Sequence, residues 1–183
     1  MPFDPARMFD AAVVLSAAGW SARVEQPGDA AFLQSLYSAN APMAQILPPL
    51  MLLQQHHMQD ANFAVQYPQA MRRILLRGGQ PVGRIIIDWS GSAQVHGVDI
   101  AVLPPALSQD ESGRGGGLIL LRAWLAICDA LGRPASLFVR ADNRARRLYT
   151  HLGFAELPGQ AADAPMIEMA RVVPQDTGIK TVS

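Results

Sequence analysis

The chain of 183 residues is predicted to form a single mixed α/β domain with a mostly antiparallel sheet. Half of the residues are hydrophobic, which is enough for one full core, and a second domain of ordinary size would be crowded. Short β-rich runs follow one another through residues 74–103, with turn residues between them. A long helical pattern then leads to a short buried run at 136–140, which favours a strand, helix, strand unit with one parallel strand pair.

The first elements alternate between extended and helical patterns. A weak alternation predicts a strand over Trp20–Glu25, and Pro27-Gly28-Asp29 turns the chain into a helix over Ala30–Ser38. Asp29 is expected to cap that helix with its side chain. After three prolines, helix-compatible spacing predicts a second helix over Leu50–Val65.

Three antiparallel strands are predicted next. Ile74–Leu76 and Val82–Trp89 are β-rich runs, and the segment Arg77-Gly78-Gly79-Gln80-Pro81 between them indicates a hairpin. Gly91-Ser92 marks a further turn before the strand Val95–Leu103.

Helices and strands alternate through the last third of the chain. The predicted elements are a helix over Gly116–Leu131 that stops at Gly132, a buried strand over Ser136–Arg140, a helix over Asn143–Leu152 closed by Gly153, and a last strand over Met166–Val172. We assign residues 20–173 to the domain, residues 1–19 to an N-terminal extension and residues 174–183 to a flexible C-terminal tail.

Composition excludes several classes of partner and site. Fifteen basic residues balance fifteen acidic ones, so no global field attracts nucleic acid or an anionic membrane. The apolar stretch Ala11–Gly19 is far shorter than the roughly 20 residues that span a bilayer and lacks a basic flank, so a cytoplasmic location is expected. The single cysteine, Cys128, excludes an internal disulfide and is expected to be a buried structural thiol. His56 and His57 are adjacent and point about 100° apart on a helix, so no metal site is expected.

Residues 112–117 read Ser-Gly-Arg-Gly-Gly-Gly and directly precede a predicted helix. Glycines leave the backbone N–H groups uncovered, and the dipole of a helix favours an anion at its N-terminus. The segment matches neither a Walker loop nor the dinucleotide motif G-x-G-x-x-G. It therefore favours the pyrophosphate of a nucleotide-bearing cofactor other than ATP or NAD, and the alternative is a glycine turn that binds nothing.

These residues resemble the GNAT superfamily of acyl-CoA-dependent N-acetyltransferases. The cofactor signature of the family, Q/R-x-x-G-x-G/A, lies between a strand and a long helix, and Ser112, Gly115 and Gly117 occupy its positions here. Ser112 departs from the signature, which has Gln or Arg at that position.

A second, downstream segment strengthens the resemblance. Residues 144–154 look like the N-x-x-A-x-x-L-Y-x-x-x-G-F segment of the family, with Tyr149 as its tyrosine. Counting back from Tyr149, the slot of the asparagine holds Asp142, and Asn143 is the adjacent residue.

The resemblance implies a GNAT-like single domain with a splayed parallel strand pair, a mostly antiparallel central sheet and flanking helices. It implies acetyl-CoA as co-substrate, no metal, and a V-shaped gap between the parallel strands that takes the pantetheine arm. The cofactor-binding residues that it implies are Ala101, Val102, Leu103, Arg114, Gly115, Gly116, Gly117, Leu118, Asn143 and Tyr149. Arg146 and Arg147 are further phosphate candidates, although such a cluster of charges is more often a solvated helix face.

The implied reaction is direct attack of a primary amine on acetyl-CoA in a ternary complex. Tyr149 is the candidate general acid for the departing thiolate, because a phenol pKa near 10 suits that transfer, and packing on the core is its alternative role. Asp99 is the candidate base or amine anchor, and a structural salt bridge is the alternative. The strand around Asp99 is apolar, so its carboxylate must face a cleft or be paired. His96 is a reserve base.

The expected function is therefore an N-acetyltransferase acting on an amine of a small molecule or a protein, without nucleic acid or membrane as partner. Family members often dimerise, so a homodimer is compatible with the resemblance. The alternative is a non-catalytic acyl-CoA-binding or interaction module with the same fold. The acceptor is expected to enter past residues 38–58 and 88–96. This wall contains Met43, Met51, Met58 and Trp89 but few acidic residues, which disfavours polycationic acceptors.

Overall fold

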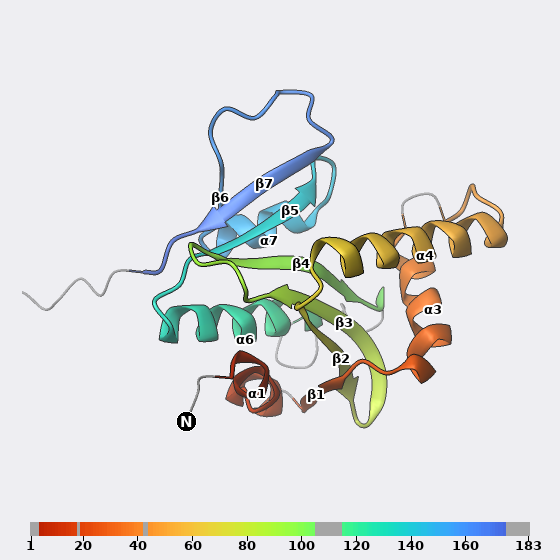
Figure 1. The fold of residues 1–183 in the computed structure, drawn as a ribbon, viewed down its shortest axis with the longest axis horizontal. Helices are drawn as coiled ribbons and strands as arrows, with labels where there is room; N and C mark the ends of the chain where they lie inside the picture. The colour runs from red at the N-terminus through yellow and green to blue at the C-terminus, as the bar shows by residue number, and fades with distance from the viewer. Residues whose placement is uncertain (1–3, 18, 42–43, 105–114, 175–183) are drawn as a thin grey trace, which may run out of the picture.

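The computed structural model describes residues 4–17, 19–41, 44–104 and 115–174. Within these residues, a seven-stranded sheet has the order β1-β2-β3-β4-β5-β7-β6 (Figure 1). The strands are β1 (Trp20–Val24), β2 (Met71–Arg77), β3 (Gln80–Asp88), β4 (Val95–Val102), β5 (Ala135–Arg140), β6 (Ala155–Glu156) and β7 (Met166–Arg171). Every neighbouring pair is antiparallel except β4 and β5, which are parallel. The predicted mixed sheet is confirmed.

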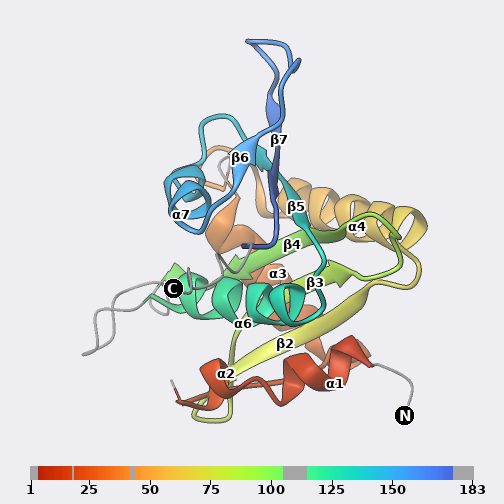
Figure 2. The same ribbon diagram turned by 90° about the vertical axis from the view of Figure 1, so that its left-hand side faces the viewer.

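Helices cover both faces of this sheet. They are α1 (Pro5–Asp10), α2 (Val13–Ala17), the 3-10 turn η1 (Pro27–Asp29), α3 (Ala30–Asn40), α4 (Pro49–Gln66), α6 (Gly116–Ala130) and α7 (Ala145–His151). Figure 1 shows α1 and α6 on one side of the sheet and α3 and α4 on the other. Both α1 and α2 contact α6, and Figure 2 shows the three helices from the side.

The face under α6 carries the main hydrophobic core. Trp124 and Leu120 of α6 are completely buried there, together with apolar residues of β2 to β5 and β7. Residues 1–19, expected as an extension, supply α1 and α2 to this core, because Phe9 and Leu15 are buried in the same cluster. Asp4 starts α1, since its carboxylate accepts hydrogen bonds from the N–H groups of the first turn.

The face under α3 and α4 has a much smaller apolar cluster of Leu33, Leu36 and Ile74. Of the α4 side chains, Leu52 and His56 are buried. Four large apolar side chains near or on α4 are exposed to solvent instead: Leu50, Met51, Met58 and Val65. Of the methionines predicted for the acceptor wall, Met51 and Met58 are exposed to solvent, and Met43 lies outside the described residues.

The parallel strands β4 and β5 pair over three positions, from Val95 with Ala135 to Gly97 with Leu137, and separate after them. A Cβ atom on Gly97 would lie 2.7 Å from the indole of Trp124, so a glycine is needed where the ring packs against the strand. The splayed pair implied by the family resemblance is thus present, and a buried tryptophan lies directly beneath the point of separation.

Local structure also differs from the sequence prediction at Asp29 and at β6. Asp29 does not cap α3 with its side chain; its carboxylate accepts from the Gln26 N–H at 2.8 Å and pairs with Arg23 at 2.7 Å. The hydrogen bonds of Arg23 hold the pKa of Asp29 below its usual range. The strand β6 was not predicted, because two residues are too short for any periodic pattern. The hairpin is as predicted, with positive φ at Gly78 and Gly79.

Candidate functional site

The second half of β4 presents free main-chain groups to the gap between β4 and β5. The Leu103 N–H donates to the Val82 carbonyl at 2.8 Å, so Leu103 pairs with β3. Hydrogen-bonded positions alternate along an antiparallel pair, and Ala101 therefore also directs its backbone toward β3. Ile100 and Val102 direct theirs toward the gap. Of the three predicted pantetheine partners, Val102 directs its backbone groups to the gap, whereas Ala101 and Leu103 direct theirs to β3. Ile100, which was not predicted, also directs its backbone groups to the gap.

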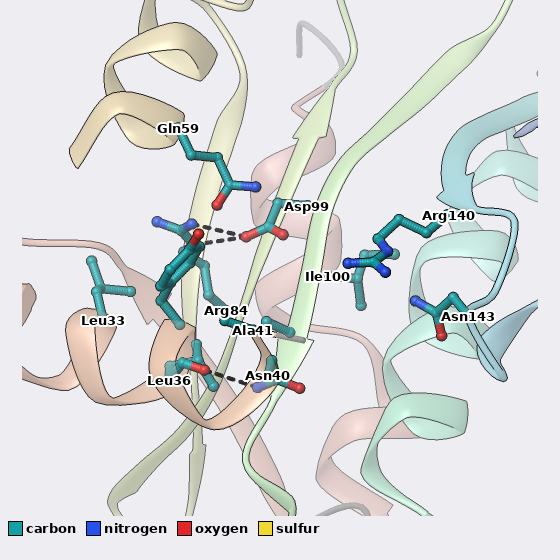
Figure 3. A pocket seen from close by; sticks show the side chains of 12 residues that line it. Leu33, Leu36, Asn40, Ala41, Gln59, Arg84, Asp99, Ile100, Arg140 and Asn143 are labelled. Atoms are coloured by element: carbon teal, nitrogen blue, oxygen red, sulfur yellow. Dashed lines mark hydrogen bonds and ion pairs between the residues drawn. The ribbon is translucent and has the colours of Figure 1, made fainter. Parts of the chain in front are cut away.

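Two cavities meet at this gap. The β4–α3 cavity has a volume of about 330 Å³ and lies between the second half of β4 and the end of α3 (Figure 3). The α4–β5 cavity has a volume of about 650 Å³ and lies between the second half of α4 and β5. Both are lined by the same five residues: Gln59, Asp99, Ile100, Arg140 and Asn143. The space on the α3/α4 side is therefore continuous with the opening between the parallel strands.

Asp99 lines both cavities and is also ion-paired. Arg84 on β3 donates to one oxygen, Oδ2, from Nε at 3.1 Å and from Nη2 at 2.9 Å (Figure 3). Among the described residues, no donor reaches the other oxygen, Oδ1. The salt bridge predicted as the alternative role of Asp99 is therefore present, and its role as base or amine anchor stays a prediction.

Arg84 belongs to a buried charge network beneath α4. Its guanidinium also donates to Asp60 of α4 at 2.9 Å, and Arg72 of β2 donates to the same Asp60 oxygen at 3.0 Å. Glu25 lies 3.6 Å from Arg72. Burial raises the pKa of Glu25 against the opposing effect of Arg84 and Arg72, whereas these two arginines outweigh burial at Asp60 and lower its pKa. The network ties α4 to three strands of the sheet.

Tyr149 of α7 lines the α4–β5 cavity together with Asp99. Its ring packs edge-on to Phe154, with centroids 5.9 Å apart. Tyr149 therefore also packs on the core, which was its alternative predicted role. Burial raises the pKa of Tyr149 to about 12. The phenol therefore stays protonated at neutral pH, which is the form that a general acid needs.

His96 of β4 lines the same cavity and is held on three sides. Its Nδ1 lies 2.9 Å from the Ser136 hydroxyl, the Tyr67 ring stacks on it at 5.6 Å, and Phe138 packs edge-on at 5.4 Å. Burial lowers the pKa of His96. The imidazole is consequently neutral at neutral pH and able to accept a proton.

Asn143, rather than Asp142, faces the cavities. Asp142 is exposed and pairs with Arg140 at 2.6 Å. The Asn143 Oδ1 accepts from the Ala145 N–H at 2.9 Å. The amide nitrogen of the side chain is left on the side of Ile100 (Figure 3). Asn143, which follows the position of the asparagine in the GNAT segment, thus lies at the gap.

The N-terminus of α6 begins at the predicted glycines. Gly115 precedes the helix and its carbonyl accepts from the Leu118 N–H at 3.0 Å. The prediction that Leu118 donates to a cofactor is therefore wrong, because its N–H is used within the helix. Gly116 and Gly117 occupy the first turn, where backbone donors lack intrahelical partners. Ser112 and Arg114 lie outside the described residues.

The arginines of α7 differ in how they are engaged. Arg146 donates to the Ala141 carbonyl at 2.6 Å and pairs with Glu156, so it is not free for a phosphate. Arg147 is exposed.

Other predictions concern sites away from the gap. Cys128 is fully buried, and burial raises its pKa to about 12, as expected for a structural thiol. Within the described residues, we find no cluster of three or more His, Cys, Asp or Glu side chains placed to hold a metal ion. No helix in this part of the chain has the length and apolar character needed to cross a membrane.

Comparison with known proteins identifies the architecture. No family model and no curated protein sequence matches the chain. Solved structures do: the PaiA N-acetyltransferase of Thermoplasma acidophilum in complex with coenzyme A has a TM-score of 0.61 at 14% identity, covering 84% of this chain and 98% of that one. The ribosomal-protein-S18-alanine N-acetyltransferase of Escherichia coli has a TM-score of 0.58 at 19% identity, covering 87% and 98%.

Ard1 of Thermoplasma volcanium has a TM-score of 0.56 at 20% identity, covering 86% of this chain and 99% of that one. A protein of Desulfovibrio desulfuricans assigned to the GNAT family has a TM-score of 0.57 at 15% identity, covering 85% of this chain and 99% of that one. The chain has the GNAT fold.

Proposed function

We propose that the chain is an N-acetyltransferase that moves an acetyl group from acetyl-CoA to a primary amine by direct attack in a ternary complex. The observation that carries this proposal is the gap after Gly97, into which β4 presents free main-chain groups and at which Tyr149 and Asp99 line one cavity. The PaiA structure, which has the same fold, is in complex with coenzyme A.

Acetyl-CoA would bind along β4. Its pantetheine amides would pair with the backbone of Ile100 and Val102 as an added strand does, and the Asn143 amide would line the opposite side. The Val102 carbonyl already accepts from the Asn40 amide at 3.3 Å, which leaves the N–H of Val102 and both groups of Ile100. The pyrophosphate would meet Gly115, Gly116 and Gly117 at the start of α6, where the helix dipole favours an anion.

The side chains at the gap suit the proton transfers of the reaction. Asp99 Oδ1 would bind the ammonium of the acceptor, and neutral His96 would take a proton from it, directly or through a water. The free amine nitrogen would then bond to the thioester carbonyl carbon, the carbon–sulfur bond would break, and the Tyr149 hydroxyl would protonate the departing thiolate. The nitrogen would release its second proton through water to the Tyr149 oxygen, which restores the phenol and leaves the neutral amide. Asp99 is thus proposed as anchor and Tyr149 as general acid.

The test measures cofactor binding before turnover. Gly117→Glu adds bulk and like charge at the proposed pyrophosphate site and should abolish acetyl-CoA binding in calorimetry, while Gly28→Glu, in open space on η1, should not change it. Unchanged CoA affinity in a folded Gly117→Glu protein would exclude the proposed pyrophosphate site at the start of α6.

Turnover is tested by thiol release over a panel of primary amines. Tyr149→Phe keeps the ring and removes the hydroxyl, so kcat should fall by roughly 10- to 1000-fold with little loss of stability. Binding of CoA without thiol release from any amine would instead support a non-catalytic acyl-CoA-binding module, and full activity of Tyr149→Phe would rule out its role as acid.

A further inference from the structure

The α4–β5 cavity has an aromatic wall that the proposed chemistry does not require. Phe63 and Tyr67 come from the end of α4, and Phe138 comes from β5 on the opposite side. Tyr67 and Phe138 both contact the His96 ring, one by stacking and one by its edge. These contacts fix the orientation of the wall, because each ring is held by its neighbour.

Large apolar side chains at the rim of this cavity are exposed. Phe138 is 50% exposed and Met166 of β7 is 44% exposed. Isolated apolar side chains on a surface need no explanation, but two that line one cavity beside fixed aromatic rings form a surface suited to an apolar ligand.

Charge around the cavity is sparse. Among the described residues that line it, Asp99 is the single carboxylate, and Arg84 already holds one of its oxygens. The guanidinium of Arg140 also lines the cavity and is paired with Asp142. The other polar side chains of α4 that line the cavity are the uncharged amides Gln59, Asn62 and Gln66. Such a lining can neutralise one ammonium group and leaves a second one without a partner.

We propose that the acceptor is a small monoamine with an aromatic body, whose ammonium binds Asp99 and whose ring lies against Tyr67 and Phe138. This inference rests on the proposed function, since it names the acceptor of that same site. The volume of about 650 Å³ is within the range that takes small ligands, and a flat ring gains more from aromatic walls than an alkyl chain of equal size. Polyamines and peptide N-termini are the competing acceptors.

The experiment measures amine binding apart from turnover. Calorimetry, with and without CoA, compares 2-phenylethylamine, ethylamine, spermidine and a short peptide with a free N-terminus. We expect 2-phenylethylamine to bind most tightly and Phe138→Ala to weaken it by about 10-fold or more, down to the affinity of ethylamine. Ethylamine itself should bind Phe138→Ala and the native protein equally.

One control variant keeps the result specific. Val65→Ala shortens an apolar side chain that is 80% exposed on α4, two residues before Tyr67, and that does not line the cavity, so it should leave every affinity unchanged. Tighter binding of spermidine or of the peptide, or an equal effect of Phe138→Ala on ethylamine, overturns the inference. If 2-phenylethylamine binds with the expected dependence on Phe138 but releases no thiol from acetyl-CoA, the proposed acetyl transfer fails and the binding site stands.

Discussion

The two faces of the sheet are built from different chemistry. On the α6 face, Trp124 packs within a continuous apolar cluster that reaches from α1 to β7. On the α3/α4 face, the apolar cluster contains three buried residues, and Arg84 joins α4 to the sheet through carboxylates. Since successive side chains of a strand point to opposite faces, the same strands serve both.

This difference separates stability from binding. A face packed with apolar side chains excludes water and contributes most of the folding free energy. A face of paired charges contributes less net stability, because each ion loses hydration when buried, but it fixes carboxylates where a cationic ligand can reach them. Asp99 and the cavities lie on the second face, where a substitution lowers the free energy of unfolding less.

The largest expected effect is on the α6 face. Trp124→Ala should reduce the free energy of unfolding by about 3–5 kcal/mol, because it removes a completely buried ring and leaves a cavity. Urea unfolding measures it. The comparison is Leu52→Ala on α4, where we expect a value near the lower end for a buried leucine, about 2 kcal/mol. A loss at Leu52 as large as that at Trp124 would show that the two faces carry equal stability.

An intermediate effect is expected from the charge network. Arg84→Met leaves Glu25, Asp60 and Asp99 with Arg72 alone. It should cost about 1–3 kcal/mol, less than a fully buried pair because Asp60 and Asp99 are partly exposed. The loss should shrink at pH 4, where the unpaired carboxylates take up protons.

The control for that experiment is Arg7→Met, which breaks the exposed Arg7–Asp4 pair and should cost less than about 1 kcal/mol. Equal losses for Arg84→Met at pH 4 and pH 7 would mean that packing, and not charge, holds α4 to the sheet.

The smallest effect concerns the buried His56 of α4, whose two ring nitrogens have no hydrogen-bond partner among the described residues. Burial, with a further contribution from Arg84, lowers the pKa of His56 in the folded protein. The unfolded chain therefore binds more protons just below pH 6.5, and the stability due to this residue is present above that pH and lost as the pH falls.

His56→Leu removes the titration and should flatten the loss of stability between pH 7.5 and pH 5.5, measured by urea unfolding at both values. His151→Leu, at an exposed position, should leave the slope unchanged. His96 has a lowered pKa of the same sign and remains in both variants. A slope that is the same in native protein and His56→Leu contradicts the assignment.

Local patterns predicted most of the fold. The strands β2 to β5, the hairpin at Gly78 and the helix α6 follow from alternation, glycine and helix periodicity, which act over a few residues. The helices α1 and α2 were missed, because their segment buries Phe9 and Leu15 against α6, more than one hundred residues away in the chain. No pattern within the segment shows that partner.

The candidate site was predicted only in part, because contacts between distant segments leave no local pattern in the sequence. Tyr149 and Asp99 were identified through a family motif and an isolated charge in an apolar strand, and the structure brings both to one cavity. Arg84 gave no comparable indication, since a charged residue in a strand does not reveal whether Asp60 or Asp99 will meet it. The wall of Tyr67 and Phe138 depends on helix and strand packing that sequence spacing does not encode.

The short pairing of β4 with β5 creates an open strand edge in the middle of a sheet. Such edges attract extended chains indiscriminately, and proteins protect them with inward-pointing charges and blocked carbonyls. Asp99 places a charge beside this edge, and the Asn40 amide covers the Val102 carbonyl at its far end. A charge beside the edge and a carbonyl that is already bonded both disfavour pairing with a second chain.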